Sequence, residues 1–108
     1  MEAFKLFRKY KKIKTQIKGR GRYTLWVADT PTKKSVGLSR VKKLPKRHGM
    51  IFTYTEDVDH SFTMKNTRIP LEIIFLDVNF EIVDYFKCKP YEKKSVRPSS
   101  KYRYVIEI

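Results

Sequence analysis

Cysteine, histidine and long hydrophobic runs are scarce in this 108-residue sequence. The single cysteine, Cys88, excludes an internal disulfide, which is typical of proteins from reducing compartments. His48, His60 and Cys88 stand far apart, so we expect no metal site and no cofactor. No segment approaches the ~20 apolar residues of a membrane span. The N-terminus lacks the apolar run of a secretion signal, so we expect no such signal.

Acidic residues are also few, with 11 Asp and Glu against 25 Lys and Arg, and the formal net charge is +14. The charge is uneven, because basic segments at residues 1–22, 31–49 and 87–103 surround an acid-rich centre at residues 56–84. Such a distribution favours a polyanionic partner: nucleic acid, an anionic membrane or an acidic protein surface. Solubility alone would explain the charge equally well.

The N-terminal segment has the spacing of an amphipathic basic helix over residues 2–18. Apolar residues recur on one helical face, namely Leu6, Tyr10, Ile13 and Ile17. Glycines at positions 19 and 21 favour an end to this helix. We therefore predict an N-terminal helix in residues 1–21, followed by one β-rich domain in residues 22–108. The helix could pack on its own domain, lie at a membrane interface or dock on a partner.

The remaining sequence alternates between short strands and turns. We predict strands at residues 22–28, 49–54, 71–77, 81–88 and 102–108. A short helix is predicted near residues 31–41, because Pro31 suits the first helical position and Asp29 or Thr30 can cap it. This order predicts an α+β, β-rich fold: a compact, mainly antiparallel, barrel-like sheet with a short helix.

Four segments, taken in this order and spacing, resemble the domain-of-unknown-function 192 family of small bacterial, archaeal and phage-borne proteins. They are Val-Ala-Asp-Thr at 27–30, Gly-Leu-Ser-Arg at 37–40, Gly-Met-Ile-Phe at 49–52, and Phe-Thr-Met-Lys-Asn-Thr at 62–67 with Ile-Pro-Leu-Glu at 69–72 and Phe75. The resemblance covers residues 22–108 and implies a compact, barrel-like β-rich domain without an established enzymatic activity. The sequence departs from the family at Ser39, Thr63 and Glu72, where methionine, tryptophan and aspartate are usual.

The polar group after Phe62 is the candidate ligand site. Lys65 would supply charge, while Asn66 and Thr67 would supply hydrogen-bond donors. The same residues could instead satisfy the backbone of a turn before Pro70. The candidate cleft comprises Arg40, Met50, Met64, Lys65, Asn66, Thr67 and Glu72.

Glu72 interrupts an otherwise apolar strand. A carboxylate there is costly unless it is paired, and Lys65, Arg68 or Arg40 could be its partner. Alternatively, Glu72 could act as a general acid or base. No catalytic residue is assigned, and we lean towards a protein that is not an enzyme.

The basic segments supply the candidate contacts to a polyanion. These are Lys5, Arg8, Lys9, Lys11, Lys12, Lys33, Lys34, Lys42, Lys43, Lys46 and Arg47. Our leading hypothesis is a non-enzymatic binding or assembly module that contacts nucleic acid or an acidic protein surface. Because of the phage-borne relatives, we expect a cytoplasmic or virion-associated complex. The alternative is a small-ligand-binding protein, or an enzyme of unknown reaction, that uses the candidate cleft.

Overall fold

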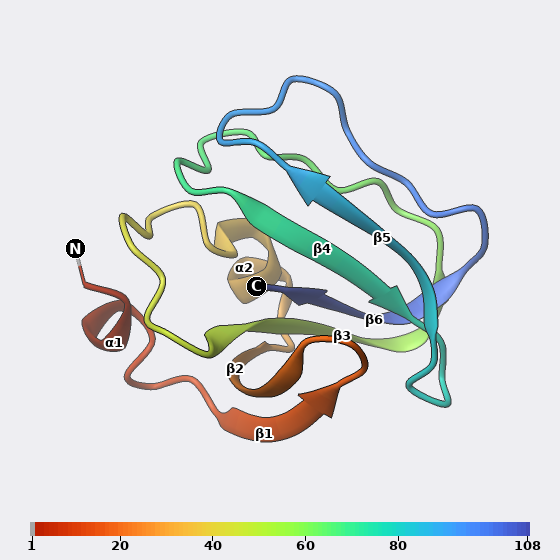
Figure 1. Cartoon of the computed structure of the whole chain (residues 1–108), viewed down its shortest axis with the longest axis horizontal. Helices are drawn as coiled ribbons and strands as arrows, with labels where there is room; N and C mark the ends of the chain where they lie inside the picture. The colour runs from red at the N-terminus through yellow and green to blue at the C-terminus, as the bar shows by residue number, and fades with distance from the viewer. Residues whose placement is uncertain (1) are drawn as a thin grey trace.

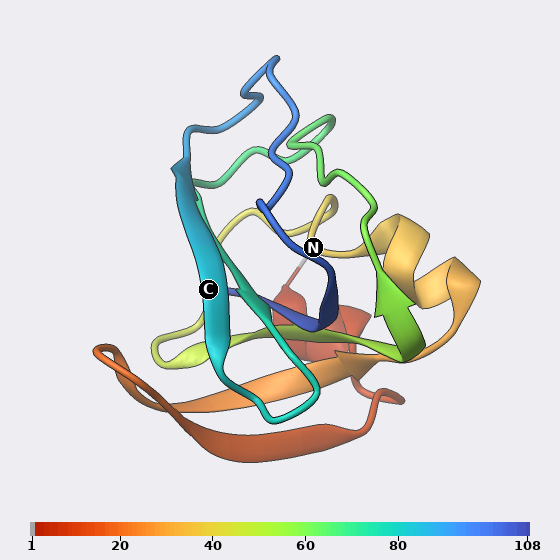
Figure 2. The ribbon, with the colours of Figure 1, turned by 90° about the vertical axis from the view of Figure 1, so that its right-hand side faces the viewer.

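The computed structural model describes residues 2–108 and consists of two short helices and six strands. In chain order these are α1 (Ala3–Leu6), β1 (Lys12–Ile17), β2 (Gly21–Ala28), α2 (Pro31–Val36), β3 (His48–Val58), β4 (Leu71–Leu76), β5 (Ile82–Cys88) and β6 (Tyr102–Glu107). The strands form one strongly curved sheet, with α1, α2 and the long loops gathered on one side of it (Figures 1 and 2).

The sheet is mixed, with the strand order β1-β2-β3-β6-β4-β5. Neighbouring strands are antiparallel except β2 and β3, which are parallel because α2 lies in the crossover between them. The predicted β-rich fold is therefore confirmed, and the helix predicted near residues 31–41 is present but spans only Pro31–Val36. The edge strands β1 and β5 do not pair within residues 2–108, so the sheet is open and the predicted barrel-like closure is not found.

The predicted helix over residues 2–18 is wrong. Only Ala3–Leu6 is helical, and Lys12–Ile17 forms the edge strand β1, which pairs antiparallel with β2. β-Branched residues at 13, 15 and 17 alternate with longer polar side chains, a pattern that suits a strand as well as a helix. Gly19 and Gly21 have φ of 78° and 98°, which allows a tight turn instead of a helix end.

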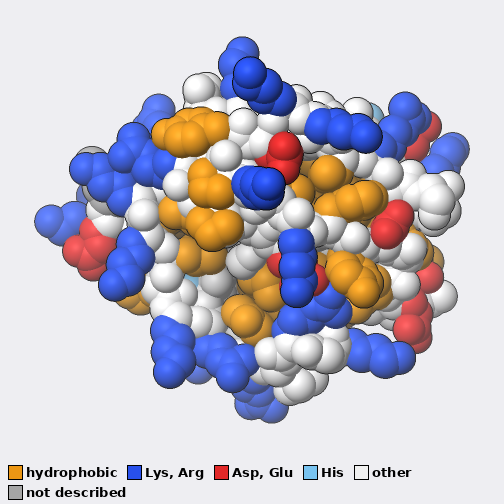
Figure 3. All heavy atoms as spheres, turned by 45° about the horizontal axis from the view of Figure 1, so that its top comes forward, with side chains coloured by type: hydrophobic (Ala, Val, Ile, Leu, Met, Phe, Trp, Pro, Cys, Tyr) orange, Lys and Arg blue, Asp and Glu red, His pale blue; other side chains and the backbone are white. Residues whose placement is uncertain are grey.

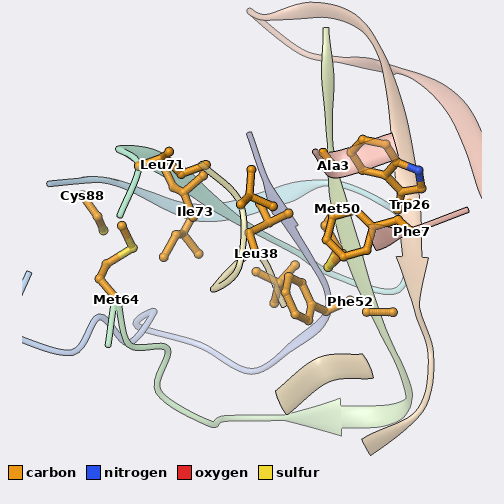
Figure 4. Packing of buried hydrophobic residues seen from close by; sticks show 14 of the residues in the cluster. Ala3, Phe7, Trp26, Leu38, Met50, Phe52, Met64, Leu71, Ile73 and Cys88 are labelled. Atoms are coloured by element: carbon orange, nitrogen blue, oxygen red, sulfur yellow. The ribbon is translucent and has the colours of Figure 1, made fainter. Parts of the chain in front are cut away.

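The central strands are buried on both faces, which explains the apolar run in β4. One face carries Trp26, Met50, Phe52, Ile73 and Phe75, covered by α1, the end of α2 and the loops. Figure 4 shows Ala3 and Phe7 beside Trp26 at one end of this layer, and Met64 and Cys88 at the other. The opposite face carries a second buried cluster, formed by Ile17, Leu25, Ile51, Ile74, Leu76 and Ile106. Successive side chains point to opposite sides of a strand, so the position of a residue along its strand determines which of the two clusters it joins.

Candidate functional site

A cleft of about 440 Å³ opens on the helix side of the sheet, between α2 and the loop of residues 59–67. We call it the α2 cleft. Pro31 begins α2, and the Thr30 hydroxyl accepts a hydrogen bond from the Lys33 backbone N–H at 3.2 Å. Gly37 ends α2 with a φ of 49°, and a Cβ at this position would lie 3.4 Å from the Phe52 ring. Local contacts thus fix both ends of α2, which forms one wall of the cleft.

Glu107 on β6 lies on the floor of the α2 cleft. Its neighbours in the sheet are Met50 on β3 and Ile73 on β4, which are both fully buried. Glu107 is only 6% exposed, and within residues 2–108 it has no ion pair or side-chain hydrogen bond, so its carboxyl oxygens meet only the solvent of the cleft. Burial raises the pKa of this carboxyl group to about 8. At neutral pH it is therefore mainly a neutral acid, because burial penalises its charged form and no cation within residues 2–108 forms an ion pair with it.

The walls of the α2 cleft carry positive charge. Lys34 and Lys65 both line it, from α2 and from the opposite loop. The Lys34 ammonium lies 3.9 Å from the centroid of the Tyr54 ring, and burial lowers the pKa of Lys34. Burial, together with the smaller effect of the Glu107 charge, raises the pKa of Tyr54 to about 12. The cleft thus combines an acidic floor with basic walls.

The structure divides the candidate cleft that the sequence predicted. Lys65 and Thr67 line the α2 cleft, and Met64 is buried in the core. Asn66 lines a separate hollow beside Lys93. Two further members, Arg40 and Met50, do not line the α2 cleft; Arg40 is exposed and Met50 lies in the core.

The segment of residues 63–67 is also a hydrogen-bonded turn. The Lys65 backbone N–H donates to the Thr63 hydroxyl at 3.1 Å, and the Thr67 N–H donates to the Met64 carbonyl at 3.0 Å. Asn66 has a left-handed φ of 60°, which asparagine tolerates better than most residues. The Thr63 hydroxyl thus satisfies part of the local backbone, and the Thr67 hydroxyl donates to the Lys65 carbonyl at 3.4 Å, whereas the Asn66 side chain makes no hydrogen bond within residues 2–108.

Glu72 lies outside the α2 cleft. Its carboxylate forms a bidentate pair with the Arg20 guanidinium, whose Nε donates at 3.0 Å. The guanidinium also lies 4.7 Å from the centroid of the Tyr85 ring. The predicted ion pair thus exists, but its partner comes from the β1–β2 turn instead of Lys65, Arg68 or Arg40. Lys65, Asn66 and Glu72 do not converge in one pocket.

Sequence reasoning missed Glu107, although a usable signal was present. Strand alternation places it on the same face as Val105, within a segment that reads Val-Ile-Glu-Ile. A carboxylate at such a core-facing position is the same signal that singled out Glu72. Only the three-dimensional contacts distinguish the paired carboxylate from the unpaired one.

The candidate polyanion contacts fall into separate groups. α1 lies against the loop of residues 42–47 across a shallow hollow lined by Phe4, Lys42 and Lys43. We call residues 4–9 and 42–46 the basic end, and Figure 3 shows Lys and Arg side chains gathered on the left, where α1 lies in Figure 1.

The other predicted contacts lie elsewhere or are engaged by the protein itself. Lys33 lies 3.6 Å from Asp29, and Lys34 lines the α2 cleft. Arg47 donates to the Arg20 carbonyl at 2.8 Å, and its guanidinium lies 5.4 Å from the centroid of the Tyr23 ring. Lys11 is exposed just before β1, and Lys12 is its first residue.

Neither helix between residues 2 and 108 is long and apolar enough to cross a membrane. The same residues contain no group of three or more His, Cys, Asp or Glu side chains placed to hold a metal ion.

Comparison with known proteins gives one family and two similar folds. The family model DUF192, described as Uncharacterized ACR, matches residues 13–108, so the match includes β1. A chain from Sinorhizobium meliloti 1021, provisionally described as a transcription regulator, has a TM-score of 0.81 and 25% identity over 92% of this chain and 81% of its own. A protein of unknown function from Novosphingobium aromaticivorans DSM 12444 has a TM-score of 0.78 and 25% identity, over 92% of this chain and 72% of its own. A search of the curated proteins finds no match.

Proposed function

The chain belongs to the DUF192 family, and we propose that it is a non-enzymatic binding module whose basic end contacts nucleic acid. The observation that carries this proposal is that α1 and the loop of residues 42–47 meet at one end of the molecule. Two basic segments that are more than thirty residues apart in sequence thereby form one surface. A phosphate backbone is attracted to such a surface without any specific base contact.

The basic end has charges and an aromatic ring available to a partner. Within residues 2–108, ion pairs occupy Arg20, Lys33, Arg97 and Arg103, and none of these belongs to the basic end. Phe4 is 45% exposed and lies edge-on to His48, with 5.2 Å between the ring centroids. An exposed ring beside lysines is the combination on which single-stranded bases stack. The provisional description of the Sinorhizobium protein as a transcription regulator is compatible with this partner.

An acidic protein surface is the alternative partner. In that case the protein would be an assembly component, for example of a phage virion or another complex, as the sequence led us to expect. Both partners would use the same positive surface, because long-range attraction depends on charge and not on chemical identity. We favour nucleic acid because the exposed Phe4 ring adds a feature that stacks on bases.

The test is binding of fluorescently labelled single-stranded and duplex DNA, followed by anisotropy over a series of salt concentrations. We expect the logarithm of the binding constant to fall linearly with the logarithm of the salt concentration. The triple variant Lys42→Gln, Lys43→Gln and Lys46→Gln should reduce the slope by about 2 for single strands, since each phosphate contact contributes about 0.7. Circular dichroism would check that the variants are folded.

The matched control is Lys89→Gln, Lys93→Gln and Lys94→Gln, which removes the same charge from the loop between β5 and β6. This control should change the slope by less than half as much. Equal effects of the two triple variants would show that net charge alone matters. Absence of DNA binding at low salt would contradict the nucleic-acid proposal. Binding to an acidic protein in the same experiment would support an acidic protein surface as the partner.

A further inference from the structure

We infer that the α2 cleft binds small molecules that carry an amine at one end and an anionic group at the other, with the amine on Glu107 and the anionic group on Lys34 and Lys65. This site is distinct from the basic end and goes beyond the proposed function. Its occupant would be a compact amino acid or a similar zwitterion. The inference depends on the cavity, on the buried carboxyl group without a partner and on the lysines of its walls.

The floor of the cleft carries a carboxyl group for which residues 2–108 supply no hydrogen bond or ion pair, so its only partner is what enters the cleft. Glu107 occupies a position between Met50 and Ile73 where a valine or leucine would be buried without cost. An ionised carboxylate without a hydrogen bond is strongly disfavoured there. The Glu107 side chain lines the cleft, so a ligand can reach it. An ammonium group compensates a buried carboxylate best, because it combines opposite charge with hydrogen-bond donors.

The walls supply the complementary charge at a distance from the floor. Lys34 is held over the Tyr54 ring and makes no ion pair with Glu107, so the opposite charges of the cleft stay separated. Lys65 lines the cleft from the facing loop. A ligand with two opposite charges can therefore satisfy both ends at once, whereas a simple anion or a simple amine satisfies only one end.

The size and lining of the cleft favour a short ligand. A volume of about 440 Å³ lies in the lower part of the range for small-molecule sites. Phe52 and Phe62 pack edge to face, with 5.3 Å between their ring centroids, and both line the cleft. These rings can contact the methylene groups that separate the two charged ends. The wall hydroxyls of Ser39 and Thr67 donate to backbone carbonyls of the protein and can accept hydrogen bonds from a ligand.

Binding of an amine should be linked to loss of a proton from Glu107. The other titratable side chains that line the cleft are Tyr54 on β3, Lys34 on α2, and His60 and Lys65 on the facing loop. Cys88 on β5 lies outside the cleft, but close enough for the charge of Glu107 to raise its pKa. Burial raises the pKa of Tyr54 and of Cys88, and the charge of Glu107 raises both further, so neither would lose a proton at neutral pH. Glu107 has a pKa of about 8, so it is mainly protonated at pH 7, and an ammonium ligand that binds its carboxylate would release most of a proton.

The experiment is isothermal titration calorimetry with glycine, β-alanine, 4-aminobutyrate and 5-aminopentanoate, at pH 7 in two buffers with different ionisation enthalpies. We expect one chain length to bind best and the buffer dependence to report a release close to one proton. Propionate and propylamine serve as probes with a single charged end, and each should bind at least about tenfold more weakly.

Two variants test the two ends of the site one at a time. Glu107→Gln copies the shape of the neutral acid, and it should weaken binding of the best amino acid at least about tenfold and abolish proton release. Lys34→Gln should weaken binding about fivefold and leave proton release intact. The control Glu56→Gln, at an exposed position on β3, should change neither quantity.

Three results would overturn the inference. The first is no binding of any member of the series at ~10 mM, which would exclude dissociation constants in the millimolar range. The second is binding without proton release, which would exclude an amine on Glu107. The third is equal binding to the wild type and to Glu107→Gln. If the Glu107 variant does not fold, titration of the Glu107 carboxyl carbon by NMR in the wild type decides the question, because the bound amine must lower its pKa.

Discussion

Glu72 and Glu107 lie on paired strands only one position out of register, yet they have opposite environments. The Glu72 backbone exchanges hydrogen bonds with Ile108, while Glu107 pairs with Ile73. Strand alternation sends their side chains to opposite faces of the sheet. Glu72 meets Arg20, and Glu107 meets only apolar residues and the cleft. The comparison shows that a carboxylate in an apolar strand suggests a ligand site only when the fold leaves it without a partner.

The largest expected effect concerns the pH dependence of stability at Glu107. Its pKa is about 8 in the folded protein, above the ordinary value of 4.5, so the folded state retains a proton that the unfolded state loses. The stability associated with this group is therefore fully present below pH 4.5 and is lost as the pH rises through 8. Because glutamine cannot ionise, the Glu107→Gln variant does not lose this stability as the pH rises. We expect the variant to be about 4 kcal/mol more stable than the wild type at pH 9.

Urea unfolding of both proteins between pH 4 and pH 9 measures this difference. The two proteins should have similar stability at pH 4, where both side chains are neutral, and should diverge as the pH rises. Parallel curves over the whole range would mean that Glu107 has a partner that stabilises its charge.

The next prediction concerns the close packing of Gly49 on β3 against the Glu107 backbone on β6. A Cβ on Gly49 would overlap the Glu107 carbonyl oxygen and lie 2.7 Å from the Ile108 side chain. Gly49→Ala should therefore cost about 3 kcal/mol and displace the floor of the cleft, which thermal unfolding and ligand titration would detect. Gly19→Ala is the comparison, because Gly19 has a φ of 78° but no atom within 4 Å of an added Cβ. It should cost only about 1 kcal/mol, and an equal loss would contradict the steric explanation.

A third effect tests the paired carboxylate. Arg20→Met leaves the half-buried Glu72 without its bidentate partner, so we expect a loss of about 2 kcal/mol in the free energy of unfolding. The control is Arg97→Met, since Arg97 and Asp59 form an exposed pair 3.2 Å apart. That variant should stay within about 0.5 kcal/mol of the wild type by urea unfolding. A similar small effect at Arg20 would remove the contrast between the two glutamates.

The smallest effect concerns the α2 wall of the cleft. Thr30→Ala removes the hydrogen bond to the Lys33 N–H and should cost about 1 kcal/mol. Hydrogen exchange should speed up in α2 and leave β4 unchanged, because the cap acts only on the first turn. Thr32→Ala lies within the same helix without capping it and should be neutral or slightly stabilising. Faster exchange in both variants would show that α2 is unstable for another reason.

Local patterns predicted much of the fold. A helix cap at Asp29 or Thr30, the start of a helix at Pro31 and the apolar strand β4 depend on neighbours within a few residues. All three are found, with Thr30 as the cap. The family resemblance is also confirmed. The segment of residues 2–18 failed because Ile13 and Ile17 suit both a helical face and an alternating strand. Pairing with β2 settles that choice, and no local pattern contains this information.

The candidate site was less predictable for the same reason. Lys65 and Thr67 do line a cleft, but its other wall is α2 and its floor is Glu107. Sequence spacing could not predict that α2 and Glu107 form a cleft with the loop of residues 59–67, because α2 precedes this loop and Glu107 follows it by forty residues.

The sequence by itself determined the family, the β-rich class, the positions of most strands and the strong positive charge, because each depends on composition or on short-range periodicity. The tertiary structure alone decided which charges meet. Arg20 finds Glu72 across 52 residues of chain, α1 meets the loop of residues 42–47, and Glu107 is left facing a cleft. The physical reason is that the energy of a buried charge depends on its partner in space, and partners distant in sequence are brought together only when the sheet forms.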